Sequence, residues 1–137
     1  EDMATWEGTV KAGREAFAGA GITPEDVDVA ELHDAFTIVE LIAYEDLGFC
    51  KKGNSKEMVR NHETDLDGKI PVNCSGGLKA RGHPISPTGV AQVVEIADQL
   101  RGRSGERQVN DPRIGLAHNI GGAGGTTSVH LFRKIAG

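Results

Sequence analysis

A glycine-rich segment in the middle of the chain reads Gly76-Gly77-Leu78-Lys79-Ala80-Arg81-Gly82-His83-Pro84. Glycine permits a positive φ and a close approach of the backbone to a ligand, at a cost in conformational entropy. A histidine set between glycines and a proline therefore indicates a built loop rather than a disordered linker. Because histidine titrates near neutrality, His83 is a candidate acid, base or hydrogen-bond donor in this loop.

A second glycine cluster lies near the end of the chain and reads Gly121-Gly122-Ala123-Gly124-Gly125. It joins two predicted strands, so no helix N-terminus follows it that could hold a phosphate. Residues 76–82 match neither the dinucleotide-binding pattern nor the P-loop pattern. The sequence therefore argues against a nucleotide site in either cluster.

The rest of the chain alternates between helical and strand patterns. The predicted helices are residues 5–20, 36–47 and 88–101, and the predicted strands are residues 27–32, 113–119 and 126–132. Thr88 is the expected cap of the last helix. The polar residues 51–69 are expected to form a surface loop. This order of elements predicts an α/β fold.

Composition limits the classes of function. The 137 residues suit one domain, with 38% apolar residues, a net charge of −5 and no run of like charges. A nucleic-acid partner would need clustered Lys and Arg, and a membrane span would need about 20 apolar residues, so neither is predicted. Two cysteines without C-x-x-C spacing, and no secretory signal, favour a reduced, cytoplasmic setting.

Three histidines lie at junctions between predicted elements: His33 after a strand, His83 before a helix and His118 at the end of a strand. Loops at strand ends are where α/β folds place their sites. Zinc sites usually show close-spaced pairs of ligands, and none occurs here, so no metal site is predicted. His62 and His130 are expected to be packed or surface residues.

The motifs around these histidines follow one another in the order of a known family. They read His33-Asp34-Ala35-Phe36, Val72-Asn73-Cys74-Ser75-Gly76-Gly77, the His83 loop, and Asn119-Ile120-Gly121-Gly122. They resemble the N-E-A-F, V-N-x-S-G-G, G-H-P and C-x-G-G motifs of the thiolase superfamily, and the match is collinear over essentially the whole chain. The H-D-x-F and H-N-x-G-G forms are similar to the archaeal and sterol-carrier-protein branches.

The resemblance implies that residues 1–137 are a C-terminal thiolase half-domain, with a mixed sheet and flanking helices. It implies an acyltransferase of the acetyl-CoA acetyltransferase type, which makes or cleaves a 3-oxoacyl-CoA without a bound cofactor. His83 would activate a cysteine thiolate and donate to an enolate oxygen, and His33 would hold a water in the same oxyanion site. The substrate-binding glycines would be Gly76, Gly77, Gly82, Gly121 and Gly122.

Two features depart from the family pattern. The nucleophilic cysteine of the family belongs to the N-terminal half, and neither Cys50 nor Cys74 matches its position, so both are expected to be small buried residues. Asn119 replaces the acid/base cysteine of the C-x-G turn, and asparagine is neutral. His118 beside it is either a substitute acid/base or a structural hydrogen-bonding residue. A thiolase-like aldolase or condensing enzyme, or a non-catalytic scaffolding subunit, is compatible with these changes.

The resemblance also implies an incomplete fold. Two strands that precede the first helix of a thiolase half are missing, so we expect a gap at the centre of the sheet with unpaired backbone groups. The chain alone is expected to be inactive and to need an N-terminal thiolase half or a companion chain. A homo- or hetero-oligomer is expected, with a small OB-fold protein that helps to hold coenzyme A as a further partner.

Overall fold

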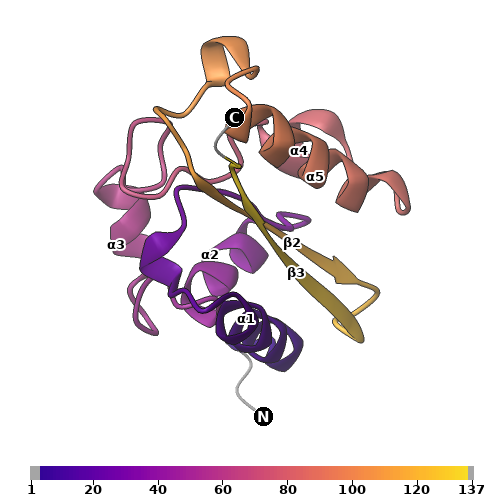
Figure 1. Cartoon of the computed structure of the whole chain (residues 1–137). Coiled ribbons are helices and arrows are strands. Elements are labelled where there is room, and N and C mark those ends of the chain that lie inside the picture. Colours follow the sequence, from indigo (N-terminus) through magenta and orange to yellow (C-terminus); the bar gives the residue numbers. More distant parts are fainter. Residues whose placement is uncertain (1–3, 136–137) are drawn as a thin grey trace.

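The computed structural model describes residues 4–135, which form a three-stranded sheet between helices (Figure 1). Strand β1 (Val29–Glu31) runs parallel to β2 (Ile114–Gly121), and β3 (Thr126–Arg133) runs antiparallel to β2. The order β1-β2-β3 therefore makes a mixed sheet. The α/β class expected from the order of elements is confirmed.

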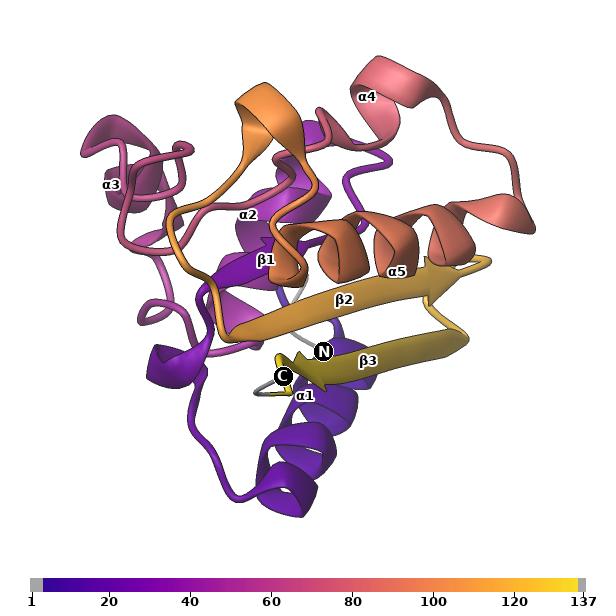
Figure 2. The ribbon, with the colours of Figure 1, turned by 45° about the horizontal axis from the view of Figure 1, so that its top comes forward.

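Helices enclose this sheet from both sides (Figures 1 and 2). Helices α1 (Glu7–Ala20) and α2 (Thr37–Asp46) lie on one face, and α5 (Pro87–Leu100) lies across the other. The connections contain α3 (Ser55–Arg60), α4 (Gly77–Arg81), and single 3-10 turns at Pro24–Asp26 and Gly105–Arg107. The three long helices lie where their periodicity predicts them, and only their ends differ.

The sheet divides the apolar core into two clusters. On the α1–α2 side, Phe17, Leu47 and Leu116 pack together, and on the α5 side Ile96 packs against Val29. Burying a large aliphatic side chain is worth about 1.5–3 kcal/mol. These contacts hold the helices on the two faces and so fix where the loops at the ends of the strands lie.

Two local predictions need correction. The polar segment 51–69 was expected to be a surface loop. It contains the helix α3, in which Ser55 and Met58 are buried, and Met58 joins the core on the α1–α2 side. The expected cap Thr88 lies inside α5, which begins at Pro87. Proline is favoured at the first helical position because its missing N–H would have no partner there.

The expected gap at the centre of the sheet is wrong. β1 pairs directly with β2 along its whole length, and β2 pairs with β3. The side-chain amide of Gln92 in α5 reaches both strands, donating to the carbonyl of His118 at 2.8 Å and to that of Glu31 at 3.5 Å. On the far side of β1, Ala30 bridges to Val72. Within residues 4–135 the open edge of the sheet is therefore that of β3, not its centre.

Candidate active site

His33 follows β1 and is 5% exposed. Its Nδ1 lies 2.7 Å from Oδ1 of Asn119 in β2. An amide oxygen can only accept a hydrogen bond, so Nδ1 carries the hydrogen and Nε2 keeps a lone pair. Burial lowers the pKa of His33 below its ordinary value. The ring is therefore neutral near pH 7 and can accept a hydrogen bond at Nε2.

His83 lies in the exposed loop between α4 and α5. Its Nδ1 is 2.9 Å from Oγ1 of the buried Thr88, whose hydroxyl donates to the carbonyl of Pro84 at 2.7 Å. A hydroxyl has a single hydrogen, so Thr88 must accept the hydrogen bond from Nδ1 of His83. Nε2 of His83 is thereby left free to accept a proton.

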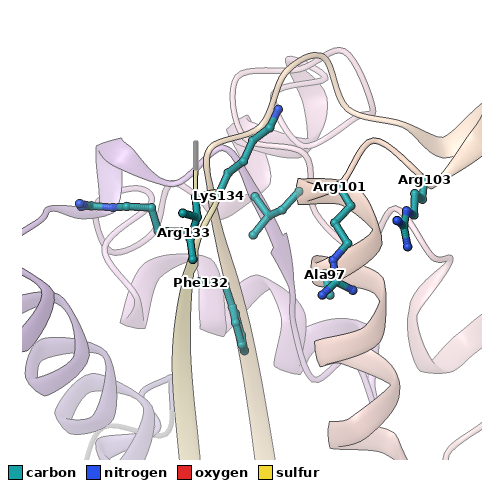
Figure 3. Close-up of a pocket in the computed structure, with 8 residues that line it drawn as sticks. Ala97, Arg101, Arg103, Phe132, Arg133 and Lys134 are labelled. Atoms are coloured by element: carbon teal, nitrogen blue, oxygen red, sulfur yellow. The ribbon is translucent and has the colours of Figure 1, made fainter. Parts of the chain in front are cut away.

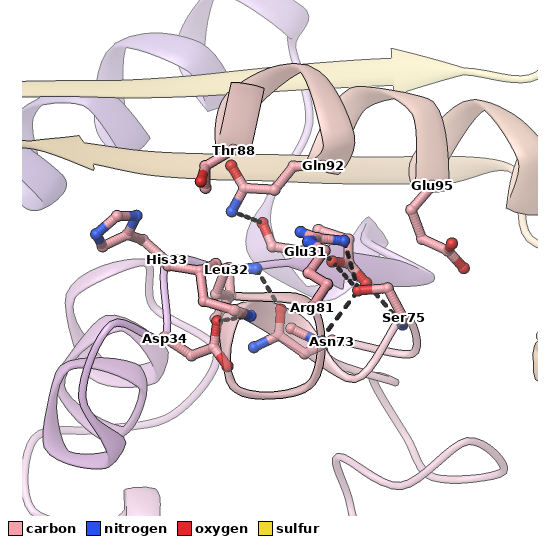
Figure 4. A network of polar contacts seen from close by, with 12 residues as sticks. Glu31, Leu32, His33, Asp34, Asn73, Ser75, Arg81, Thr88, Gln92 and Glu95 are labelled. Carbon is pink, nitrogen blue, oxygen red and sulfur yellow. Dashed lines mark hydrogen bonds and ion pairs between the residues drawn. The ribbon is translucent and has the colours of Figure 1, made fainter. Parts of the chain in front are cut away.

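The two imidazole rings meet edge to face. Their centroids are 4.9 Å apart and their planes are inclined by 81°. Asn119 belongs to the same group because it is hydrogen-bonded to His33. In Figure 4 His33 lies at the end of α5 that carries Thr88. Three of the predicted site residues, His33, His83 and Asn119, are thus brought together from distant parts of the chain.

His118 points away from this group, because neighbouring side chains of a strand face opposite sides of the sheet. Its Nε2 lies 3.0 Å from Oγ1 of Thr9 in α1, and the residue is fully buried. Its Nδ1 has no hydrogen-bond partner among residues 4–135. Burial lowers the pKa of His118 to about 3, so the ring is neutral near pH 7. Of the two roles that the sequence leaves open, these surroundings favour the structural one.

The predicted glycine residues lie in two loops at one end of the sheet. Gly76, Gly77 and Gly82 bound or begin the short helix α4, which the sequence did not predict. Gly121 ends β2, and Gly122 begins the turn to β3. Figure 2 shows this hairpin turn at the same end of the sheet as the connection from α4 to α5. The substrate-binding role of these glycines stays a prediction.

The two cysteines are free and half-buried. Burial raises the pKa of Cys50 to about 11 and that of Cys74 to about 12. Thiols with such pKa values stay protonated near neutral pH, and the thiol is a far weaker nucleophile than the thiolate. His62, paired with Asp65 at 2.7 Å, and His130 in β3 are both exposed, in line with the sequence expectation.

Sequence reasoning missed two buried carboxyl groups, those of Glu31 and Asp34. Glu31 is fully buried and Asp34 is 2% exposed. Both flank His33, and both bond to the residues that lead to His83 (Figure 4). The available signal was an acidic residue, Glu31, inside the strand predicted over residues 27–32, since such a residue is rarely buried without a partner.

Two pockets adjoin α5. The larger has a volume of about 490 Å³, lies at the C-terminal end of the helix and is lined by Ala97, Leu100, Arg101, Arg103, Phe132, Arg133, Lys134 and Ile135 (Figure 3). The smaller has a volume of about 360 Å³ and reaches Asn119, Gly89 and Ser86. Only the smaller of these two is lined by Asn119, the residue that is hydrogen-bonded to His33.

Residues 4–135 offer neither a metal site nor a membrane span. No three His, Cys, Asp or Glu side chains gather closely enough there to hold a metal ion. In the same residues no helix is long and apolar enough to cross a membrane.

The sequence model of a family described as "Thiolase C-terminal domain-like" matches residues 1–134. The chain belongs to the thiolase family. Acetyl-CoA acetyltransferase of Methanothermobacter thermautotrophicus is 51% identical over 133 residues, covering 97% of this chain and 35% of that protein. Sterol carrier protein 2 of Homo sapiens is 41% identical over 131 residues, covering 96% of this chain and 24% of that protein. The resemblance inferred from the motifs is confirmed.

A solved structure shares this thiolase fold. The structure titled "Ltp2-ChsH2(DUF35) aldolase" matches with a TM-score of 0.79 and 29% sequence identity, over 92% of this chain and 32% of that chain. The prediction of a partial thiolase-like fold is confirmed. Because the chain spans about a third of the length of these relatives or less, the activity of a whole thiolase is a proposal for it.

Proposed function

We propose that this chain supplies the histidine half of a thiolase-type acyl-CoA acyltransferase. The observation that carries the proposal is the His33–His83 pair, with ring centroids 4.9 Å apart and each Nδ1 held by a neighbour. Two imidazoles with free Nε2 atoms suit a site that takes a proton from a thiol and then stabilises an oxyanion. Relatives named acetyl-CoA acetyltransferase support this class of reaction.

His83 acts as the base in this proposal. A cysteine thiol on the other half of the enzyme gives its proton to Nε2 of His83, and the thiolate attacks the carbonyl carbon of an acyl-CoA thioester. The carbon–sulfur bond to coenzyme A then breaks, and the leaving thiolate takes the proton back from His83. The bond from Nδ1 to Thr88 keeps the ring in the tautomer that this transfer needs.

His33 contributes through its neutral ring. With Nδ1 donating to Asn119, Nε2 accepts a hydrogen bond from a water whose other hydrogen faces the developing oxyanion. Removing one preorganised donor of this kind typically costs about 2.7–4 kcal/mol of transition-state stabilisation. Asn119 has the role of orienting His33, and we assign no proton transfer to Asn119 or to His118.

The nucleophile must come from another part of the enzyme. Cys50 and Cys74 carry raised pKa values, which makes them unsuited to the role. Large apolar side chains are also exposed near the histidine segments: Phe36, Ile38, Ile85, Val90 and Val94. Exposed apolar side chains that lie near one another, such as Val90 and Val94 one turn apart on α5, often mark an interface. An N-terminal thiolase half or a companion chain that covers this surface would bring the cysteine to His83.

The first test measures coenzyme A-dependent cleavage of acetoacetyl-CoA by the complete protein that carries this chain. His83→Ala is expected to lower kcat/KM by about 10²–10⁴-fold, the usual contribution of an acid–base residue. His62→Ala is the matched control, because His62 is an exposed histidine paired with Asp65, and it should leave the rate unchanged. Unchanged activity of His83→Ala would instead support a scaffolding subunit.

A second candidate function is that of an aldolase on coenzyme A thioesters. Asn119 stands where the family pattern has an acid/base cysteine, and the structural relative is titled an aldolase. That title also names ChsH2(DUF35), which supports the expectation of a companion protein. Cleavage of a 3-hydroxyacyl-CoA without added coenzyme A would identify the aldolase, since thiolysis requires coenzyme A as the attacking thiol.

A further inference from the structure

The carboxyl group of Glu31 is enclosed at the end of β1. It is fully buried, and burying such a group is costly unless it is paired and hydrogen-bonded. Its partners come from the segment around α4 (Figure 4). Oε1 accepts the backbone N–H of Ser75 at 3.1 Å, Oε2 accepts the Ser75 hydroxyl at 2.6 Å, and Arg81 lies 3.4 Å away through Nη2.

The hydroxyl of Ser75 connects the two ends of α4. While it donates to Glu31, its oxygen accepts Nη1 of Arg81 at 2.9 Å and the backbone N–H of Gly77 at 3.1 Å. Ser75 precedes α4, and Arg81 is its last residue. Glu31 therefore holds the start and the end of this helix through one hydrogen-bonded network.

Asp34 holds the first turn of the same helix. Its Oδ1 accepts the N–H of Leu78 at 2.7 Å, and its Oδ2 lies 3.5 Å from the N–H of Lys79. These amides have no partner within the helix, because the first turn of any helix leaves its N–H groups unbonded. A helix of five residues is not stable by itself in water, so α4 depends on contacts of this kind.

The two carboxyl groups lie on either side of His33, and α4 ends two residues before His83. We propose that Glu31 and Asp34 are positioning residues. Their hydrogen bonds to α4 and to Ser75 before it set the position of His83 relative to His33. One segment, residues 31–34, thus carries one histidine of the pair and fixes the loop that carries the other. The catalytic consequence rests on the function proposed above, whereas the structural consequence does not.

The test replaces Glu31 by Gln in the complete protein. Glutamine keeps the shape of the side chain but loses the charge that attracts Arg81. Amide hydrogen exchange of residues 78–82 should become at least about tenfold faster, because local opening sets the exchange rate. The ring ¹⁵N signals of His83 should shift. We expect kcat to fall about 10–100-fold with little change in KM, because small misplacements of catalytic groups have effects of that size.

Glu95→Gln is the matched control. Glu95 in α5 is also a buried carboxyl group paired with an arginine, Arg107, at 2.9 Å, but its described bonds do not involve α4. This variant should leave the exchange of residues 78–82, the His83 ring signals and kcat at the level of the unchanged protein. Equal effects of Glu31→Gln and Glu95→Gln would show general destabilisation and overturn the proposal.

Two further variants keep the proposal testable if Glu31→Gln does not fold. Ser75→Ala removes the connecting hydroxyl from a half-buried position and should reproduce the exchange and turnover effects. Asp34→Asn keeps an acceptor for the N–H of Leu78. Amide exchange of Leu78 in this variant should therefore be at least about fivefold slower than in Asp34→Ala, because removing a helix cap usually costs about 1 kcal/mol. Unchanged exchange and ring signals in Ser75→Ala and Asp34→Ala would overturn positioning, whereas an active His83→Ala would overturn only the proposed function.

Discussion

At the scale of single residues, the site depends on how each imidazole is oriented. His33 and His83 lie edge to face, yet one is buried against Asn119 and the other is exposed and held by Thr88. In each case the neighbour accepts a hydrogen bond from Nδ1, so Nε2 keeps its lone pair. The identity of these neighbours therefore decides which nitrogen can exchange a proton.

Replacing Asn119 by Asp should change the charge state of His33. A carboxylate next to an imidazole favours the imidazolium, so the pKa of His33, now lowered by burial, should rise in this variant. Histidine ring signals recorded across a pH titration would measure the change. Asn61→Asp, at an exposed position, serves as the control. A His33 titration that stays the same in Asn119→Asp would rule out the orienting bond.

His118 should make the protein sensitive to acid. Its pKa is about 3 in the folded state, below the ordinary value of about 6.5 in an unfolded chain. The neutral ring therefore contributes stability above pH 6.5, and this stability is lost as the pH falls through that window toward 3. The slope approaches about 1.4 kcal/mol per pH unit.

Urea unfolding of the complete protein at pH 7 and pH 5 tests this point. In His118→Gln the loss of unfolding free energy between the two pH values should shrink, because glutamine does not titrate. His130→Gln changes an exposed histidine on the same sheet and should keep the original loss. Identical pH dependence in the two variants would contradict the assignment.

At the scale of elements, α4 shows how a short helix is stabilised by its surroundings. Its first residue, Gly77, has φ +64°, and a Cβ there would lie 2.2 Å from Oδ2 of Asp34. Only glycine allows both this backbone conformation and the close approach of the carboxyl group. The helix and the carboxyl group that caps it therefore require one another.

Gly77→Ala should be costly for this reason, and Gly102→Ala provides a matched control. Gly102 has φ +68°, but a Cβ there would meet no atom within 4 Å, so alanine adds only the left-handed backbone penalty of about 1–2 kcal/mol. Gly77→Ala adds the clash with Asp34, and its loss of unfolding free energy should exceed that of Gly102→Ala by about 1–3 kcal/mol. Urea denaturation compares the two variants, and equal losses would show that the contact with Asp34 does not matter.

In the molecule as a whole, two exposed surfaces are candidates for contact with another half or chain. The edge of β3 has no neighbouring strand within residues 4–135, and α5 exposes Val90 and Val94 one turn apart on one face. Edge strands and apolar patches are both surfaces that proteins tend to cover. The need for another half or chain stays a prediction, and α5 is where it can be tested.

Val90→Glu should destabilise the complete protein if another half covers α5. An unpaired charge placed in a buried interface costs about 2–4 kcal/mol. Val59→Glu is the control at a similarly exposed valine in α3, and its effect should stay within about 0.5 kcal/mol. Unfolding in urea measures both. Small effects from both substitutions would mean that this face of α5 remains in water.

Local patterns in the chain were enough to predict the type of most elements and the residues of the histidine pair. Apolar residues at helical spacing mark α5, alternation marks the segment that contains β1, and these patterns arise between near neighbours in the chain. The motifs around His33, His83 and Asn119 are likewise local, and so is the family resemblance that they carry. The helix α4 lacked such a pattern, because its stability comes from contacts with residues far away in the sequence.

How these parts meet depends on contacts between segments that are distant in the sequence. Because β1 pairs with β2, the sheet does not have the gap that was expected at its centre. The His118 side chain lies on the face of β2 that packs against α1, and not beside His83. Neither the burial of Glu31 nor its hydrogen bonds to the segment around α4 could be predicted from the sequence. Strand pairing, burial and the partners of a carboxyl group depend on distances between segments that the chain brings together only when it folds.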